Sequence, residues 1–200
     1  MKAIWTFVLL FFANFSSGQT LLNSGEYDFG LKLAFSDSLN KVSGYFENYR
    51  GLDEKTGNPQ FSCIFYFEGF LKGNKANIKT YYPEWKDNDL IIGTLEIKDK
   101  NNVTIKLPEE HGGCWNVQHF ADEPVDFEIE KRTNWATIRY ITENKSYFYA
   151  DKNGLKKTKT YLIKGDIVCA NKPNGDYIYC TYFGKKTTKG WLKTIGLNKL

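Results

Sequence analysis

The sequence predicts an all-β protein in which an antiparallel meander, folded as a barrel or a sandwich, precedes a smaller β-barrel. Three observations predict this class. Short segments rich in aromatic and β-branched residues alternate with clusters of turn residues along most of the chain. No window shows a convincing apolar repeat of 3.6 residues, which an amphipathic helix requires. The net charge changes sign near residue 143, which indicates a boundary between two domains.

The first 18 residues have the pattern of a secretory signal peptide. One lysine precedes an uncharged apolar run from Ala3 to Ala13, and the small residues Ser16 and Gly18 stand shortly before Gln19. The apolar run is shorter than the roughly 20 residues that span a bilayer. We therefore expect a soluble mature chain that begins at Gln19, is periplasmic or secreted, and has no membrane anchor.

Residues 19–143 form the first expected domain, an antiparallel meander of about seven to nine strands. The alternation is clearest over residues 91–107, where every second residue of two segments is apolar or glycine and one hairpin face therefore points inward. The expected strands cover residues 38–48, 61–71, 76–83, 90–99, 102–109, 125–131 and 135–141.

The segment SGEYDFGLKLAFSDSLNKVSGYFEN, residues 24–48, resembles the first hairpin of small calycin-like barrels. Barrels of this size either hold a small ligand or fill the lumen with side chains. Five aromatic residues are candidates for lining such a lumen, and packing in the core or at the rim is the alternative. They are Tyr81, Tyr82, Trp85, Trp115 and Trp135.

Four cysteines, an even number, predict two disulfides in an exported chain. The pair Asn174–Gly175 lies between two β-rich runs and predicts a two-residue hairpin. Pairing outward from that turn places Cys169 opposite Cys180, although a shift of the turn by one residue changes the pairing. By elimination Cys63 pairs with Cys114, which closes a loop of about 50 residues and contributes on the order of 4 kcal/mol.

The stretch HGGCWNVQHF, residues 111–120, places both histidines of the chain around Cys114. A disulfide is the expected role of this cysteine, and the spacing matches no common zinc motif. We therefore expect no catalytic residue, metal or cofactor here. The loop 108–124 is a candidate binding site, and a disulfide-tethered barrel cap is the alternative. Its candidate binding residues are His111, Trp115, Asn116, Gln118 and His119.

From Lys145 to Leu200 the chain has 12 lysines, no arginine and 3 aspartates, whereas residues 19–144 have 14 basic and 20 acidic residues. The second expected domain, residues 144–200, has an aromatic first strand at 147–149, a turn at Gly165 and Asp166, the Asn-Gly hairpin, and a closing strand that begins at Gly190. In this order and spacing it resembles a bacterial SH3-like (SH3b) domain. Five strands without a helix agree with a small barrel, whose expected core is Leu162, Ile167, Ile178, Tyr182 and Leu192.

The SH3b resemblance implies recognition of cell-wall peptides or other peptides, or support of a neighbouring domain. Strand alternation places Tyr177 and Tyr179 on the face opposite Ile178 and Tyr182, so the first pair is expected at the surface. The turns beside them carry many lysines, which suit an anionic wall polymer, an acidic peptide or an acidic protein. A solvated lysine face is the alternative, and export argues against nucleic acid. The expected binding residues are Tyr149, Tyr177, Tyr179 and Trp191.

The function expected from the sequence is that of a monomeric, non-enzymatic exported binding protein, with a cell-wall peptide or a protein as its partner. One alternative is an inhibitor or immunity-type protein that blocks an extracytoplasmic hydrolase through the loop 108–124. The other is a Cys-His hydrolase that uses Cys114 with His119 or His111.

Overall fold

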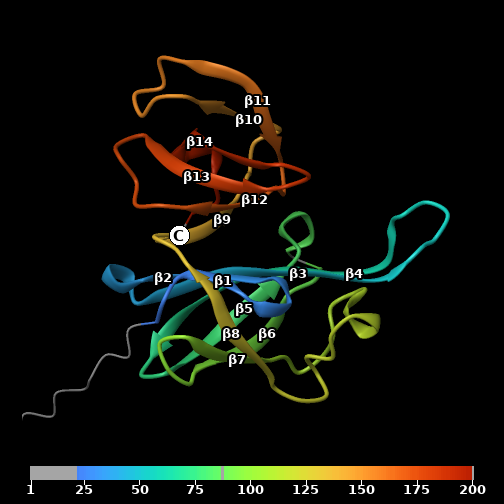
Figure 1. Ribbon diagram of the computed structural model, residues 1–200. Coiled ribbons are helices and arrows are strands. Elements are labelled where there is room, and N and C mark those ends of the chain that lie inside the picture. The colour runs from blue at the N-terminus through green and yellow to red at the C-terminus, as the bar shows by residue number, and fades with distance from the viewer. Residues whose placement is uncertain (1–21, 87, 200) are drawn as a thin grey trace, which may run out of the picture.

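The computed structural model describes residues 22–86 and 88–199. The chain is all-β, as predicted, and forms a closed eight-stranded barrel and a second, six-stranded sheet, both antiparallel (Figure 1). The expected signal peptide and its cleavage point at Gln19 lie outside the described residues. Within the described ranges, no helix has the length and apolar character needed to cross a membrane.

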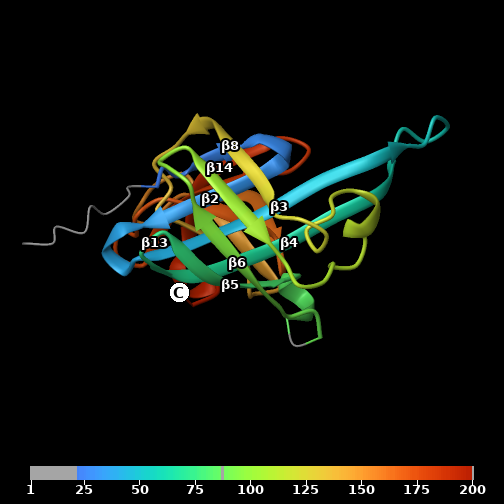
Figure 2. The same ribbon diagram turned by 90° about the horizontal axis from the view of Figure 1, so that it is seen from below.

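The barrel is a simple meander in which each strand pairs with the next and β1 pairs with β8 to close it. The sequence was compatible with either a barrel or a sandwich, and the structure shows that this domain is a barrel. Two of its strands, β3 and β4, are longer than the others and project from the barrel as a hairpin (Figure 2). The strands are β1 (Gly25–Tyr27), β2 (Leu31–Ser36), β3 (Lys41–Leu52), β4 (Pro59–Lys72), β5 (Lys75–Tyr81), β6 (Ile91–Ile97), β7 (Asn102–Lys106) and β8 (Val125–Arg132).

The lumen of the barrel is filled by side chains. The alternation in β6 and β7 points inward as predicted, with Leu95 and Ile105 fully buried. Gly44 leaves room for the ring of Phe67, which would lie 2.2 Å from a Cβ at that position. Five phenylalanines, each no more than 1% exposed, dominate this core, and large aromatic burial is the main stabilising term available to a small β domain. They are Phe46, Phe65, Phe67, Phe120 and Phe127.

The five aromatic candidates for a ligand-binding lumen lie elsewhere. Trp85 and Trp115 are 65% and 60% exposed, and Tyr82 is half-buried outside the barrel core. Tyr81 and Trp135 are buried, but in a separate cluster between the barrel and the second sheet. Of the two interpretations left open by the sequence, lining of the lumen does not hold for these five residues, because inward positions are already occupied by phenylalanine and aliphatic side chains.

The second sheet has the strand order β11-β10-β14-β13-β12-β9. Residues 145–200 supply five of these strands, the number expected, but the sixth comes from the other side of the expected boundary. Strand β9 pairs along its whole length with β12. The boundary near residue 143 thus lies inside this sheet, between β9 and β10. The strands are β9 (Thr137–Tyr140), β10 (Lys145–Tyr149), β11 (Lys157–Ile163), β12 (Ile167–Ala170), β13 (Tyr177–Phe183) and β14 (Thr187–Lys193).

The core of the second sheet contains most of the residues expected there. Leu162, Ile178 and Leu192 are at most 3% exposed, and the half-buried Tyr182 packs against them. Ile167 differs, because it packs against the cluster between the two sheets.

A buried interface joins the barrel to the second sheet. Its cluster contains Tyr45, Tyr66 and Tyr81 from the barrel, together with Ile138 and Cys169 from β9 and β12. The Tyr66 hydroxyl donates a hydrogen bond to the Ile138 carbonyl at 3.1 Å, and the Ile138 amide donates to Ser43 Oγ at 2.8 Å. These two hydrogen bonds satisfy the buried hydroxyl of Tyr66 and the buried backbone groups of Ile138 across the interface.

The expected disulfide between Cys169 and Cys180 is wrong. Ala170, not Cys169, lies opposite Cys180. The two-residue turn is Gly175–Asp176, which pairs Asn174 with Tyr177, and one extra residue between Asn174 and β12 then brings Ala170 opposite Cys180. An odd shift of register turns one side chain to the other face of the sheet. Cys169 consequently packs in the interface and Cys180 in the core of the second sheet, and both are buried free thiols.

Candidate functional site

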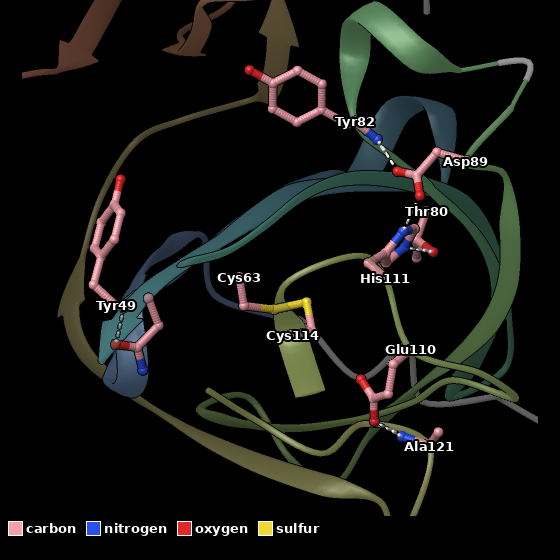
Figure 3. The surroundings of a disulfide bond; sticks show 10 residues. Tyr49, Cys63, Thr80, Tyr82, Asp89, Glu110, His111, Cys114 and Ala121 are labelled. Atoms are coloured by element: carbon pink, nitrogen blue, oxygen red, sulfur yellow. Dashed lines mark hydrogen bonds and ion pairs between the residues drawn. A yellow bond between two sulfur atoms is a disulfide. The ribbon is translucent and has the colours of Figure 1, made fainter. Parts of the chain in front are cut away.

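The loop 108–124 is attached to the barrel by the predicted disulfide between Cys63 and Cys114 (Figure 3). Cys63 lies on β4 near the base of the projecting hairpin, and Cys114 opens a short 3-10 turn. The neighbouring Gly113 has a φ of 86°, and a Cβ there would lie 2.3 Å from the carbonyl oxygen of Ser62. The disulfide and the glycine together hold the loop against β4.

His111 is a structural residue and not part of an exposed surface. Its side chain is almost fully buried, and its ring stacks on Phe65 with centroids 5.0 Å apart. Nε2 lies 2.7 Å from Thr80 Oγ1 on β5, and Nδ1 lies 3.0 Å from Asp89 Oδ1 (Figure 3). Asp89 also accepts a hydrogen bond from the Tyr82 amide. His111 thus connects three parts of the chain: β5, the residues Tyr82 and Asp89 that follow it, and the loop 108–124.

The order carboxylate, imidazole, hydroxyl in Asp89, His111 and Thr80 is also the order of a catalytic relay. Thr80 is completely buried, however, and its hydroxyl lies 3.0 Å from the Ile91 carbonyl, to which it donates. A substrate cannot reach this oxygen in the structure. We therefore assign the three residues to holding the loops in place.

The other candidate residues of the loop lie at or near the surface, as expected. Trp115, Asn116 and His119 are exposed and Gln118 is half-buried, while Val117 and Phe120 anchor the loop in the barrel core. The Trp115 and His119 rings lie 5.1 Å apart, and His119 Nδ1 lies 3.3 Å from Asp122 Oδ2. We call Trp115, Asn116, Gln118 and His119 the loop surface. The free thiol that a Cys-His hydrolase requires is absent at Cys114, whose sulfur is bonded to Cys63.

The hairpin next to this loop was not anticipated as a site. Beyond Phe46, β3 pairs only with β4, and before Tyr66, β4 pairs only with β3. Tyr49, Leu52 and Phe61 are 45%, 70% and 39% exposed on this projecting part. Sequence reasoning missed it because an apolar strand pattern does not show where a strand outgrows its neighbours.

The four aromatic candidates of the second sheet lie on one face of that sheet. Tyr149 and Tyr179 are each the cross-strand partner of Trp191, on either side of it. The rings of Tyr179 and Trp191 lie 5.4 Å apart, and those of Tyr149 and Tyr177 lie 5.3 Å apart. All four are half-buried, whereas alternate residues such as Phe148, Ile178 and Leu192 face the core.

Two further tyrosines extend this row to the edge of the sheet. Tyr147 lies on the same side of β10 as Tyr149, and its ring is 5.5 Å from that of Tyr161 on β11. The sequence contained the signal, since Tyr147 and Tyr149 alternate in one strand. We call the six residues the aromatic face: Tyr147, Tyr149, Tyr161, Tyr177, Tyr179 and Trp191.

Lysines surround the aromatic face. Lys157 Nζ lies 3.6 Å from the centre of the Tyr147 ring, and Lys145 Nζ lies 4.7 Å from that of Tyr161, both cation–π distances. Lys189 and Lys193 alternate with Trp191 on β14 and so flank it on the same side of the strand. The face therefore combines flat apolar rings with positive charge.

Comparison with models of protein families, with curated proteins and with solved structures gave no match.

Proposed function

We propose that this protein is an exported, non-enzymatic binding protein whose aromatic face recognises a cell-wall peptide or a protein partner outside the cytoplasm. The observation that carries the proposal is the set of six aromatic side chains on one face, in three contacting ring pairs, with lysines beside them. Half-buried tyrosine and tryptophan give large contact area with little loss of conformational entropy on binding. Positive charge at the rim favours an acidic partner.

Export is supported by two features. The N-terminal pattern is that of a signal peptide, and the chain contains the Cys63–Cys114 disulfide, a bond typical of oxidising compartments. The SH3b resemblance of residues 144–200 agrees with recognition of wall peptides.

The test is retention on purified wall sacculi at fixed ionic strength. We expect Trp191→Ala, which opens the centre of the aromatic face, to reduce retention at least tenfold, because central aromatic residues dominate most interfaces. Trp85→Ala is the matched control, since Trp85 is 65% exposed and lies outside the face. Thermal unfolding shows whether each variant remains folded. Equal retention of the folded Trp191→Ala variant and the wild type would contradict the proposal for wall peptides.

A second function, inhibition of an extracytoplasmic hydrolase, is favoured by the projecting hairpin. An exposed Trp115 and the exposed Tyr49, Leu52 and Phe61 stand on two segments that one disulfide fixes together. Such a rigid, projecting pair of loops suits insertion into a concave site. Trp115→Ala separates the two functions: it should leave retention on sacculi unchanged, and it should abolish a stoichiometric complex with a hydrolase if that complex forms through the loop surface.

A further inference from the structure

A narrow crevice of about 130 Å³ lies between the barrel and the second sheet, beside the base of the β3–β4 hairpin. Tyr45 and Glu47 of β3 form one wall, and Tyr82 lies beside them. Asp166, Tyr182 and Phe183 of the second sheet form the opposite wall. The two parts of the fold therefore build this cavity together, and it is separate from both the aromatic face and the loop surface.

The walls of the crevice are rich in aromatic rings, whose faces attract cations. The structure already shows this attraction at one point. The ammonium group of Lys32 lies 5.0 Å from the centre of the Tyr45 ring and 4.9 Å from that of Phe183. Tyr82 and Tyr182 are half-buried and present further ring surface to the same cavity.

Two carboxylates face the crevice without a basic partner. Glu47 accepts a hydrogen bond from the Tyr49 hydroxyl, and Asp166 accepts from the Tyr182 hydroxyl at 3.2 Å and from the Ile163 amide at 2.8 Å. Among the described residues, neither carboxylate forms an ion pair within 4.0 Å. Partly enclosed carboxylates gain more from a cation than carboxylates in open water do.

The raised pKa values of two tyrosines in the crevice reflect the same negative potential. Burial, followed by the charge of Asp166, raises the pKa of Tyr182 to about 12. Burial, followed by the charges of Glu84, Asp166 and Glu47, also raises the pKa of Tyr82. This acidic pocket contrasts with the lysine-rich second half of the chain that forms one of its walls.

We propose that the crevice binds an organic cation with N–H donors, namely the ammonium group of a lysine side chain or of another primary amine. The ammonium nitrogen would donate to Glu47 and Asp166, and the alkyl chain would pack against Tyr82 and Tyr182. The volume admits one such group and not a folded segment. The inference goes beyond the aromatic face and does not rest on it.

The experiment uses the full-length mature protein and n-butylammonium chloride as the probe, followed by two-dimensional NMR of backbone amides. We expect saturable shifts at Gly165, Asp166 and Phe183. Neutral n-butanol and sodium chloride at the same concentrations are the matched controls and should not produce them. Absence of saturable shifts with butylammonium, or equal shifts with butanol, would overturn the proposal.

Isosteric variants test whether these two carboxylates bind the cation. Asp166→Asn and Glu47→Gln should each weaken butylammonium binding at least tenfold. Glu130→Gln removes the same charge from an exposed position of β8 and should leave binding unchanged. Trp191→Ala should also leave it unchanged, so failure of the aromatic face and failure of the crevice are distinguishable. Equal affinity in all four variants would show that the carboxylates do not hold the cation.

Discussion

At the scale of single residues, the two histidines differ although they lie on one loop. His111 is buried and bonded to Thr80 and Asp89, whereas His119 is about half exposed. The sequence shows two histidines around a cysteine and predicts both at a binding surface. Burial of His111 could not be predicted, because it depends on Asp89, which lies 22 positions earlier and reaches the ring only through the fold.

We expect His111→Ala to lower the free energy of unfolding by about 3 kcal/mol, because it leaves buried polar partners unsatisfied and a cavity beside Phe65. His119→Ala is the matched control and should change it by less than about 0.5 kcal/mol. Urea unfolding followed by tryptophan fluorescence measures both. Similar values for the two variants would show that the His111 contacts do not hold the loops.

At the scale of strands and turns, the sequence predicted the alternation well and the register poorly. Alternation in β6, β7 and β13 follows from local chemistry, since one face of each strand is buried. The register of the β12–β13 hairpin depends on which two residues form the turn and on one extra residue between Asn174 and β12. Gly175 has a φ of 61° and takes the first central position of the turn, while Asp176 is not left-handed, as in a type II′ turn. In the type I′ turn expected for Asn174–Gly175, the same glycine would take the second central position of the turn.

The register has a direct chemical test. We expect mass spectrometry after alkylation of the native, non-reduced protein to show no label, because the Cys169 and Cys180 thiols are buried and burial raises the pKa of both, that of Cys180 to about 12. In denaturant without reductant, two labels should appear, at Cys169 and Cys180. A denatured protein that takes up no label would instead establish a second disulfide.

At the scale of the whole molecule, the buried interface makes the barrel and the second sheet dependent on each other. Charge composition predicted two domains, and the number of strands in each was close. The interface itself could not be read from the sequence. Tyr45, Tyr66 and Tyr81 alternate with barrel-core residues on the outer side of β3, β4 and β5, and no local sequence pattern shows that a second sheet covers this side.

This interface predicts a loss of stability in alkali. Burial raises the pKa of Tyr66 well above its ordinary value of 10.0, so the unfolded chain releases this proton first and the free energy of unfolding falls as the pH rises above about 10. At pH 7, Tyr66→Phe should cost about 1 kcal/mol through loss of the bond to Ile138. By about pH 11 that difference should disappear, because the wild type alone loses about 1.4 kcal/mol to tyrosine ionisation.

Urea unfolding of both proteins at pH 7 and pH 11 measures this effect. A Tyr66→Phe difference that stays constant with pH would indicate that Tyr66 is exposed to water in solution, and the packing of the two sheets would then need revision.

The position of β9 restricts how this chain can be recombined with others. A transplant of the C-terminal part that starts at residue 144 would leave behind the strand that covers one side of β12. The backbone amides and carbonyls of β12 that point toward β9 would then lose their partners, whereas those that point toward β13 would keep theirs. An unsatisfied sheet edge of this kind favours self-association. A boundary placed before Trp135 keeps all six strands of the second sheet together. An exchange of this part between proteins therefore preserves the sheet only if it includes the ten or so residues before position 144, which charge composition assigns to the barrel.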